Sequence, residues 1–309
     1  MSVAFVFPGQ GSQYAGMGKA LAEAYPEARQ VFEQADQALG FALSSLCFEG
    51  PEDSLTDTIN AQPAILATSF AALQVIRQQL GSDWQPILVA GHSMGEFSAL
   101  VCAGVLSFEA GLHLVRERGR LMKRAGELFP GRMAAIIKLE RETLIELCTE
   151  ACAATGGVVQ IANDNAPGQI VISGDKPTLE KALELARARG AKRCIPLAVS
   201  IPAHSALMTQ AAQEFRVVLD QVAFATPAVP VVGNVEARPV KLEKLCDELE
   251  AQLVSPVRWT ESVQYIANQG VDCFVEIGPK DVLSGLVKRI DPGVTTCSVG
   301  DPEGLAALL

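Results

Sequence analysis

The feature that most constrains the fold of this chain is a serine flanked by glycines between an apolar segment and a helix-forming segment. The residues are Gly91-His92-Ser93-Met94-Gly95, with the apolar run 87–90 before them and the small-residue stretch 96–105 after them. A strand, a sharp turn and a helix in this order are typical of a nucleophile elbow, whose strained turn requires that neighbouring side chains be absent. A lone G-x-S-x-G is a weak signal, but this context favours a nucleophilic Ser93 over a tight structural turn.

Composition and charge exclude several classes of protein. The chain has 309 residues, and 49% of them are hydrophobic, which supplies the core of one large domain or two. No apolar run approaches the roughly 18 residues of a membrane helix, and the N-terminal residues do not resemble a signal peptide. We therefore expect a cytoplasmic protein without membrane contact. The net charge of −10 argues against nucleic acid as a partner.

The eight cysteines are scattered along the chain. Cys148 and Cys152 are the one pair at helical spacing, and no histidine lies nearby to complete a zinc site. We expect reduced core thiols and no bound metal.

The order of predicted elements indicates an α/β protein with an inserted small domain. The first part predicts a strand at 3–7, a helical stretch ending near residue 39, and helices over 62–80 and 108–127. The pattern then changes to strands at 133–139, 158–162, 169–173 and 192–199, with helices over 141–153 and 176–189. This βαββαβ order is that of a ferredoxin-like domain.

After the predicted insertion the α/β pattern resumes. It predicts strands at 230–235 and 273–277 and helices over 243–253, 257–269 and 280–289. We therefore expect a discontinuous large domain, residues 1–127 and 200–309, interrupted by a ferredoxin-like insertion at residues 128–199.

A serine nucleophile needs a base, and the chain has three histidines. His92 is adjacent to Ser93, where neighbouring side chains diverge, and His113 falls on the polar side of the predicted helix 108–127. His204 lies in the loop 200–205, where the chain returns toward the large domain. Elimination favours His204 as the base; the alternative is a loop histidine that is hydrogen-bonded to the helix after it.

Arg118 falls in the apolar arc of the helix 108–127, among leucine, valine and methionine. A buried guanidinium stays charged and needs an anion. That anion is either an internal Asp or Glu or a substrate carboxylate, which a guanidinium can grip with two hydrogen bonds.

Acyl transfer also requires hydrogen-bond donors for an oxyanion. An elbow provides the backbone amide after the nucleophile, here that of Met94. The loop of Gln10 leaves the first strand at its carboxyl end, where ligand sites of α/β sheets gather, and is well placed for the second donor.

Five segments together resemble the malonyl-CoA:acyl carrier protein transacylases, in order and over nearly the whole chain. They are Phe7–Gln13, Gly91–Leu100, Arg118-Gly119, Asn163–Ile172 and Pro202-Ala203-His204. The resemblance implies an α/β-hydrolase-like large domain with a ferredoxin-like insertion.

The resemblance also implies roles for individual residues. Ser93 would be the nucleophile, His204 the base, Arg118 the clamp for the malonyl carboxylate, and the amides of Gln10 and Met94 the oxyanion hole. Gln252 matches the position whose backbone carbonyl orients the histidine, which makes the pair a dyad. Gln62 and Asn163 match residues near the substrate pocket.

The implied function is transfer of a malonyl group from malonyl-CoA to the phosphopantetheine thiol of an acyl carrier protein, for fatty acid synthesis and without a bound cofactor. A stand-alone acyltransferase that loads a polyketide synthase carrier is the related alternative. A serine esterase or thioesterase and a non-catalytic carrier-binding subunit are alternatives of different classes. Met94 and Phe97 depart from the commoner Leu and Tyr of the fatty-acid pattern, which leaves the acyl selectivity open.

Carrier proteins are generally acidic, so an acidic chain needs a local basic patch to bind one. Two groups of basic residues are candidates, and solvated helix faces explain each equally well: Arg116, Arg120 and Lys123, or Arg187, Arg189, Lys192 and Arg193. The second group is the predicted docking site.

Overall fold

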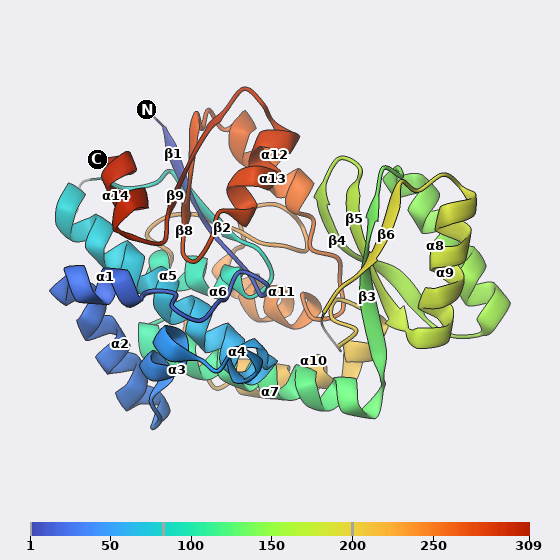
Figure 1. Ribbon diagram of the computed structural model, residues 1–309, viewed down its shortest axis with the longest axis horizontal. Coiled ribbons are helices and arrows are strands. Elements are labelled where there is room, and N and C mark those ends of the chain that lie inside the picture. The colour runs from blue at the N-terminus through green and yellow to red at the C-terminus, as the bar shows by residue number, and fades with distance from the viewer. Residues whose placement is uncertain (1, 82–83, 199–200) are drawn as a thin grey trace.

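Two β-sheets organise the chain in the computed structural model, which describes residues 2–81, 84–198 and 201–309. The larger sheet is parallel, with the strand order β7-β2-β1-β8-β9, and the smaller is antiparallel, with the order β4-β5-β3-β6 (Figure 1). The fold is thus a mixed α/β fold, as the sequence predicts.

The parallel sheet is built around β1, whose five residues are all buried. Side chains alternate along a strand, so Ala4 and Val6 join one apolar cluster and Phe5 and Phe7 join another. Helices α12 and α13 cover the first face, and α5, α6 and α7 pack on the second. The strands are β1 (Val3–Phe7), β2 (Leu88–Gly91), β7 (Val231–Val232), β8 (Cys273–Ile277) and β9 (Thr295–Val299).

The helices around this sheet follow the predicted segments closely where the apolar period is long. They are α1 (Lys19–Ala24), α2 (Pro26–Leu39), α3 (Leu43–Glu49), α4 (Glu52–Thr56), α5 (Thr58–Leu80), α6 (Gly95–Cys102), α7 (Phe108–Leu128), α10 (Thr209–Leu219), α11 (Leu245–Ala251), α12 (Trp259–Asn268), α13 (Val282–Ile290) and α14 (Pro302–Leu308). Short 3-10 turns, Ala206–Met208 and Leu242–Lys244, precede α10 and α11.

Helix α5 is a long apolar helix, although polar residues interrupt its apolar run. By length and composition it is sufficiently apolar to cross a membrane, with a mean hydropathy of 1.3. However, 78% of its apolar window is buried inside the structure. The helix lies against α2 and α7, so its apolar surface belongs to the protein core.

The smaller sheet and its two helices follow one another in the order βαββαβ that the sequence predicts, and they lie to one side of the parallel sheet (Figure 1). Helices α8 and α9 share an apolar cluster with this sheet. The elements are β3 (Gly131–Ile137), α8 (Arg141–Thr155), β4 (Val159–Ala166), β5 (Gln169–Asp175), α9 (Lys176–Ala188) and β6 (Arg193–Pro196).

Strand β4 is longer than predicted, because its polar second half is held by partners distant in the chain. The strand bulges around Asn163, and the backbone of Val257 bonds to Ala162 O and Asp164 N, both at 2.9 Å. β4 thereby joins the small sheet to the segment before α12. The last predicted strand is shorter than expected and ends at Pro196; Val199, its predicted last residue, lies outside the described residues.

Candidate active site

The turn at Ser93 has the geometry of a nucleophile elbow. Ser93 has a φ of 52°, in the left-handed region that serine seldom adopts. A Cβ at Gly91 would lie 1.9 Å from Gly95 O, and a Cβ at Gly95 would lie 2.2 Å from Phe7 O. Neither position therefore accepts a side chain, which is the reason for the two glycines of the motif.

Ser93 and His204 form a hydrogen-bonded pair. Ser93 Oγ lies 2.8 Å from His204 Nε2, and His204 Nδ1 lies 2.8 Å from the carbonyl oxygen of Gln252. Because a carbonyl only accepts, Nδ1 carries the proton and Nε2 presents its lone pair to the serine. The buried position and the nearby Arg118 charge lower the pKa of His204 to about 3, so the imidazole is neutral and able to accept a proton.

Arg118 is buried with its guanidinium directed at the nucleophile. Its Nη2 donates to Ser93 Oγ at 3.2 Å and to Gln252 Oε1 at 2.8 Å, and its Nη1 donates to Gln62 Oε1 at 2.9 Å. Burial lowers the pKa of Arg118 to about 10, which leaves it charged at neutral pH. No carboxylate of the described residues forms an ion pair with it, so the internal Asp or Glu considered from the sequence is absent there as a direct contact.

Gln10 lines the same cavity as Ser93, and Met94 follows the serine as the N-cap residue of α6. Among residues 2–81, 84–198 and 201–309, no protein acceptor bonds the backbone N–H of either residue. The Gln10 side chain is fixed by a bond from Nε2 to Thr58 Oγ1 at 2.9 Å. The Gln10 loop packs closely against the elbow, since a Cβ at Gly9 would lie 2.4 Å from His92 O. Within the loop, Ser12 Oγ donates to Gly9 O at 2.8 Å.

A cavity of about 460 Å³ opens onto the serine. The cavity is lined by Ser93, His204 and Arg118 together with Gln10 and Asn163. The other lining residues are Gly11, Gln13, Glu52, Thr56, His92, Met122, Met133, Leu197, Ala198, Ile201, Ala203 and Lys280. Gln62 lies behind Arg118, fully buried, and contacts the guanidinium rather than the cavity.

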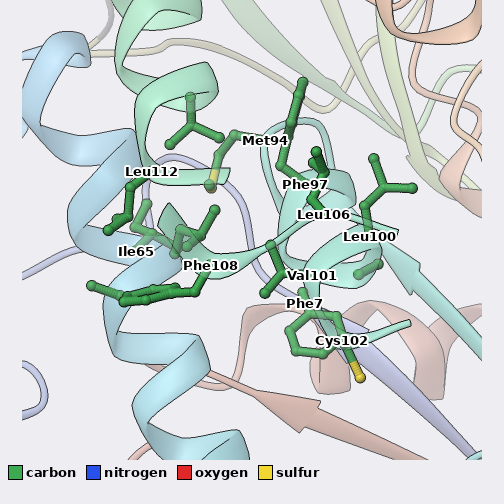
Figure 2. Packing of buried hydrophobic residues seen from close by; sticks show 14 of the residues in the cluster. Phe7, Ile65, Met94, Phe97, Leu100, Val101, Cys102, Leu106, Phe108 and Leu112 are labelled. Atoms are coloured by element: carbon green, nitrogen blue, oxygen red, sulfur yellow. The ribbon is translucent and has the colours of Figure 1, made fainter. Parts of the chain in front are cut away.

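Met94 and Phe97, the two departures from the commoner pattern, both point into the core. Figure 2 shows them in one buried cluster with Leu100 and Phe108, and neither side chain is exposed. The Arg118 guanidinium carbon lies 5.8 Å from the centre of the Phe97 ring. The Met94 side chain therefore belongs to the core, and the Phe97 ring lies beside the guanidinium of Arg118.

The other two histidines lie where the sequence predicts. His92 Nε2 lies 2.8 Å from Asn165 Oδ1, and the ring packs edge-on against Trp259. His113 is exposed on α7. Within the described part of the chain, no cluster of three or more His, Cys, Asp or Glu side chains could hold a metal ion, and all eight cysteines are free.

Comparison with known proteins agrees with this geometry. The acyl transferase domain family matches residues 4–295. The malonyl CoA-acyl carrier protein transacylase of Bacillus subtilis is 48% identical over 303 residues, which cover 97% of this chain and 94% of that protein. The chain belongs to the malonyl-CoA:acyl carrier protein transacylase family. The resemblance drawn from the sequence motifs is therefore confirmed.

Solved structures of the transacylase family share the whole fold. An acyl carrier protein S-malonyltransferase from Vibrio cholerae superposes with a TM-score of 0.96 and 44% identity, and the match covers all of both chains. A malonyl-transacylase in complex with an acyl carrier protein of a type II polyketide synthase gives a TM-score of 0.96 and 45% identity, over 100% of this chain and 99% of that one.

Two polar residues that support this transacylase site were missed by the sequence reasoning. Asn234, just after β7, accepts from Ser93 N and donates to Gly91 O, both at 2.7 Å. Gln160 on β4 donates to His204 O at 3.2 Å and accepts from Ala206 N at 3.1 Å. Asn234 could have been found from its position at the carboxyl end of a predicted strand, where ligand sites of α/β sheets gather. Nothing in the sequence indicates Gln160.

Proposed function

We propose that this chain transfers a malonyl group from malonyl-CoA to the phosphopantetheine thiol of an acyl carrier protein, through a malonyl ester on Ser93. One observation carries the proposal: Ser93 Oγ contacts a neutral histidine and a buried, charged arginine in the same cavity. A hydrolytic dyad needs only the histidine. The arginine supplies a site for a carboxylate beside the reacting carbon, and the names of the relatives agree with this chemistry.

In the first half-reaction, His204 Nε2 accepts the Ser93 proton while Oγ bonds to the thioester carbonyl carbon. The tetrahedral intermediate then breaks its carbon–sulfur bond, and the proton on His204 passes to the departing sulfur of coenzyme A. In the second half-reaction the phosphopantetheine thiol gives its proton to His204, attacks the malonyl ester, and Ser93 recovers a proton as it leaves. Both intermediates place their oxyanion on the amides of Gln10 and Met94.

The position of Arg118 favours a short dicarboxylic acyl group. Its Nη2 is 3.2 Å from Ser93 Oγ, and the malonyl carboxylate is separated from the reacting carbonyl by one methylene. When this carboxylate reaches the guanidinium, it forms the direct ion pair that Arg118 lacks among the described residues. Asn163 faces the same cavity with a polar side chain and is proposed as a further substrate contact.

The rival functions differ in the fate of the acyl-enzyme. An esterase or thioesterase would release the acyl group to water, and a carrier-binding subunit would form no adduct. A transferase that serves a polyketide synthase performs the same two steps with another carrier. The solved complex of a relative with a polyketide carrier protein keeps this alternative open.

Intact-mass measurement separates these functions. The protein is incubated with malonyl-, methylmalonyl- or acetyl-CoA, and a phosphopantetheinylated carrier protein is then added. We expect a malonyl adduct that disappears as the carrier gains the same mass, and less adduct from acetyl-CoA. No adduct with any acyl-CoA would refute the proposal, and an adduct lost to water before the carrier is added would identify a hydrolase.

The state of His204 leads to a prediction for the pH dependence. Since its pKa is lowered to about 3, the base stays neutral well below pH 6.5. We expect the rate of Ser93 acylation, measured by quenched mass spectrometry, to change less than about twofold between roughly pH 5 and 8. A rate that falls with a midpoint near pH 6.5 would contradict this assignment, because it would indicate an ordinary histidine.

The docking site of the carrier protein is proposed on the α9–β6 basic cluster, namely Arg187, Arg189, Lys192 and Arg193. All four side chains are exposed, and only Arg189 has ion-pair partners, Glu146 and Glu150, among the described residues. In the alternative group, Arg120 pairs with Glu117 and Lys123 pairs with Asp57. The α9–β6 basic cluster therefore offers more unpaired positive charge to an acidic partner.

Charge reversal tests this docking site. In the double variant Arg187→Glu/Arg193→Glu we expect the second half-reaction to need about tenfold more carrier protein, while malonyl-CoA acylates Ser93 at the wild-type rate. Lys241→Glu/Lys244→Glu makes the same charge change at exposed lysines outside the cluster and serves as the control. Equal carrier dependence in the two variants would place the docking surface elsewhere.

A division of the chain into two domains belongs to the same proposal. The parallel sheet and its helices, residues 1–127 and 200–309, form an α/β-hydrolase-like domain, and residues 128–199 form a ferredoxin-like insertion. Free cysteines and the burial of α5 support a cytoplasmic location. The mechanism uses no cofactor, because each proton and bond is handled by Ser93, His204 and the two substrates.

A further inference from the structure

Glu96 is a buried acid that the proposed mechanism does not use. It lies in the first turn of α6, and none of its side chain is exposed. Burial and the nearby Glu248 raise the pKa of Glu96 well above its usual range, so the position is costly for a carboxylate. The packing of α6 does not explain why an acid is buried at this position.

The contacts of Glu96 converge on one oxygen. Its Oε2 accepts from Gln252 Nε2 at 2.7 Å and from Asn234 N at 3.2 Å, whereas its Oε1 has no partner among the described residues. Gln252 Nε2 also donates to Ser93 O at 3.1 Å. The amide nitrogen of Gln252 is therefore enclosed by two acceptors, and its Oε1 is forced to face Arg118.

We propose that Glu96 is a positioning residue, which fixes the orientation of the Gln252 amide and thereby aligns Arg118 with the substrate carboxylate. The inference rests on the proposed malonyl transfer. If the Gln252 amide turned over, its NH₂ group would face the guanidinium, and two donors would be opposed. The guanidinium would then leave its place beside Ser93 Oγ, which it holds through this network.

The same residue also supports the elbow through Asn234. The backbone of Asn234 donates to Glu96, and its side chain bonds both Gly91 and the amide of Ser93. To both Gln252 and Asn234, Glu96 supplies a hydrogen-bond acceptor, its Oε2. A glutamine amide oxygen supplies the same acceptor without the negative charge, which distinguishes positioning from compensation of the Arg118 charge.

Two substitutions test the inference. Glu96→Met keeps the volume and removes the acceptor, and Glu96→Gln keeps the acceptor and removes the charge. We expect Glu96→Met to lose roughly 10- to 100-fold in the rate of malonyl loading and to lower the preference for malonyl-CoA over acetyl-CoA at least about tenfold, since misaligned binding groups cost rate on this scale. Glu96→Gln should keep both quantities within about threefold of wild type.

Glu276→Gln is the matched control. Glu276 on β8 is also fully buried and accepts from the amides of Leu283 and Ser284, away from the cavity residues. Its variant should keep the malonyl preference. The wild type must first form the malonyl adduct; if it does not, the proposed function fails and not this inference.

The inference is overturned by either of two results in a wild type that does form the adduct. If Glu96→Gln loses the malonyl preference as Glu96→Met does, the charge and not the acceptor is what matters. If Glu96→Met lowers thermal stability or overall rate but leaves the ratio of malonyl to acetyl loading unchanged, the role is structural only.

Discussion

The Ser93→Ala variant will form no covalent malonyl-enzyme. The expected loss of transfer activity is about 10⁴-fold or more, because removal of a nucleophile leaves only binding and the oxyanion hole. Loss of the hydroxyl also frees His204 Nε2 and one Arg118 donor, but it leaves the hydrogen bond of His204 to the Gln252 carbonyl in place. Intact mass after incubation with malonyl-CoA gives the result directly.

Ser98→Ala is the control for this loss. Ser98 is a buried serine on α6, and its hydroxyl has no hydrogen-bond partner in the described chain. We expect its malonyl adduct to equal that of the wild type. An adduct on Ser93→Ala would show that another residue is the nucleophile, and loss of the adduct in both variants would indicate damage to the helix instead of removal of a reacting group.

The pairing of Ser93 with His204 could be inferred from the sequence because the chain offers so few candidates. The elbow identifies itself by local pattern, and only three histidines compete for the role of base. The structure brings His204 to 2.8 Å from the serine across 111 positions in the chain. His204 stands out because imidazole is scarce in this sequence, whereas the geometry of its loop cannot be predicted from the residues.

The supporting network could not be inferred in the same way. The network depends on contacts that Asn234, Gln160 and Glu96 make with distant segments of the chain. Asn, Gln and Glu are usually exposed residues, so residue type alone gives no sign that these three are part of a buried site. Strand β9, Thr295–Val299, was also missed, because its residues are not a clear apolar run; it forms the outer strand beside β8. The strand predicted at 230–235 exists but is shorter: β7 comprises only Val231–Val232, which pair with β2.

For Arg118, the sequence predicts the burial of the side chain but not its partners. Its place in the apolar arc of a helix correctly predicted burial, and the structure gives it 1% exposure. The sequence left open whether an internal acid or a substrate carboxylate meets the charge. The oxygens that contact it directly belong to Gln62, Gln252 and Ser93, whereas the buried Glu96 bonds to the Gln252 amide and acts on the Arg118 charge electrostatically without touching it. Uncharged acceptors hold the guanidinium in place, so a direct ion pair with it is left for the substrate carboxylate.

Arg118→Ala should therefore weaken malonyl transfer by roughly 3 to 5 kcal/mol, the scale of breaking a buried ion pair. The interaction that is lost is the ion pair between Arg118 and the malonyl carboxylate. Because an acetyl group has no such carboxylate, acetyl loading should fall far less. Arg116→Ala, which removes a half-buried arginine of the same helix that bonds Leu39 O, is the control and should leave the malonyl to acetyl ratio unchanged. Malonyl-CoA kinetics equal to wild type would show that the guanidinium is structural.

A second measurement on Arg118→Ala separates loss of a substrate contact from collapse of the site. The charge of Arg118 is one cause of the low pKa of His204, so its removal should raise that pKa toward the ordinary value of histidine. A histidine whose pKa rises becomes protonated at higher pH and can no longer accept the serine proton. Acetyl loading by the variant should therefore fall on acidification at a higher pH than in the wild type. A variant with weak malonyl loading but an unshifted acid limb would show that the guanidinium does not act on His204 over this distance.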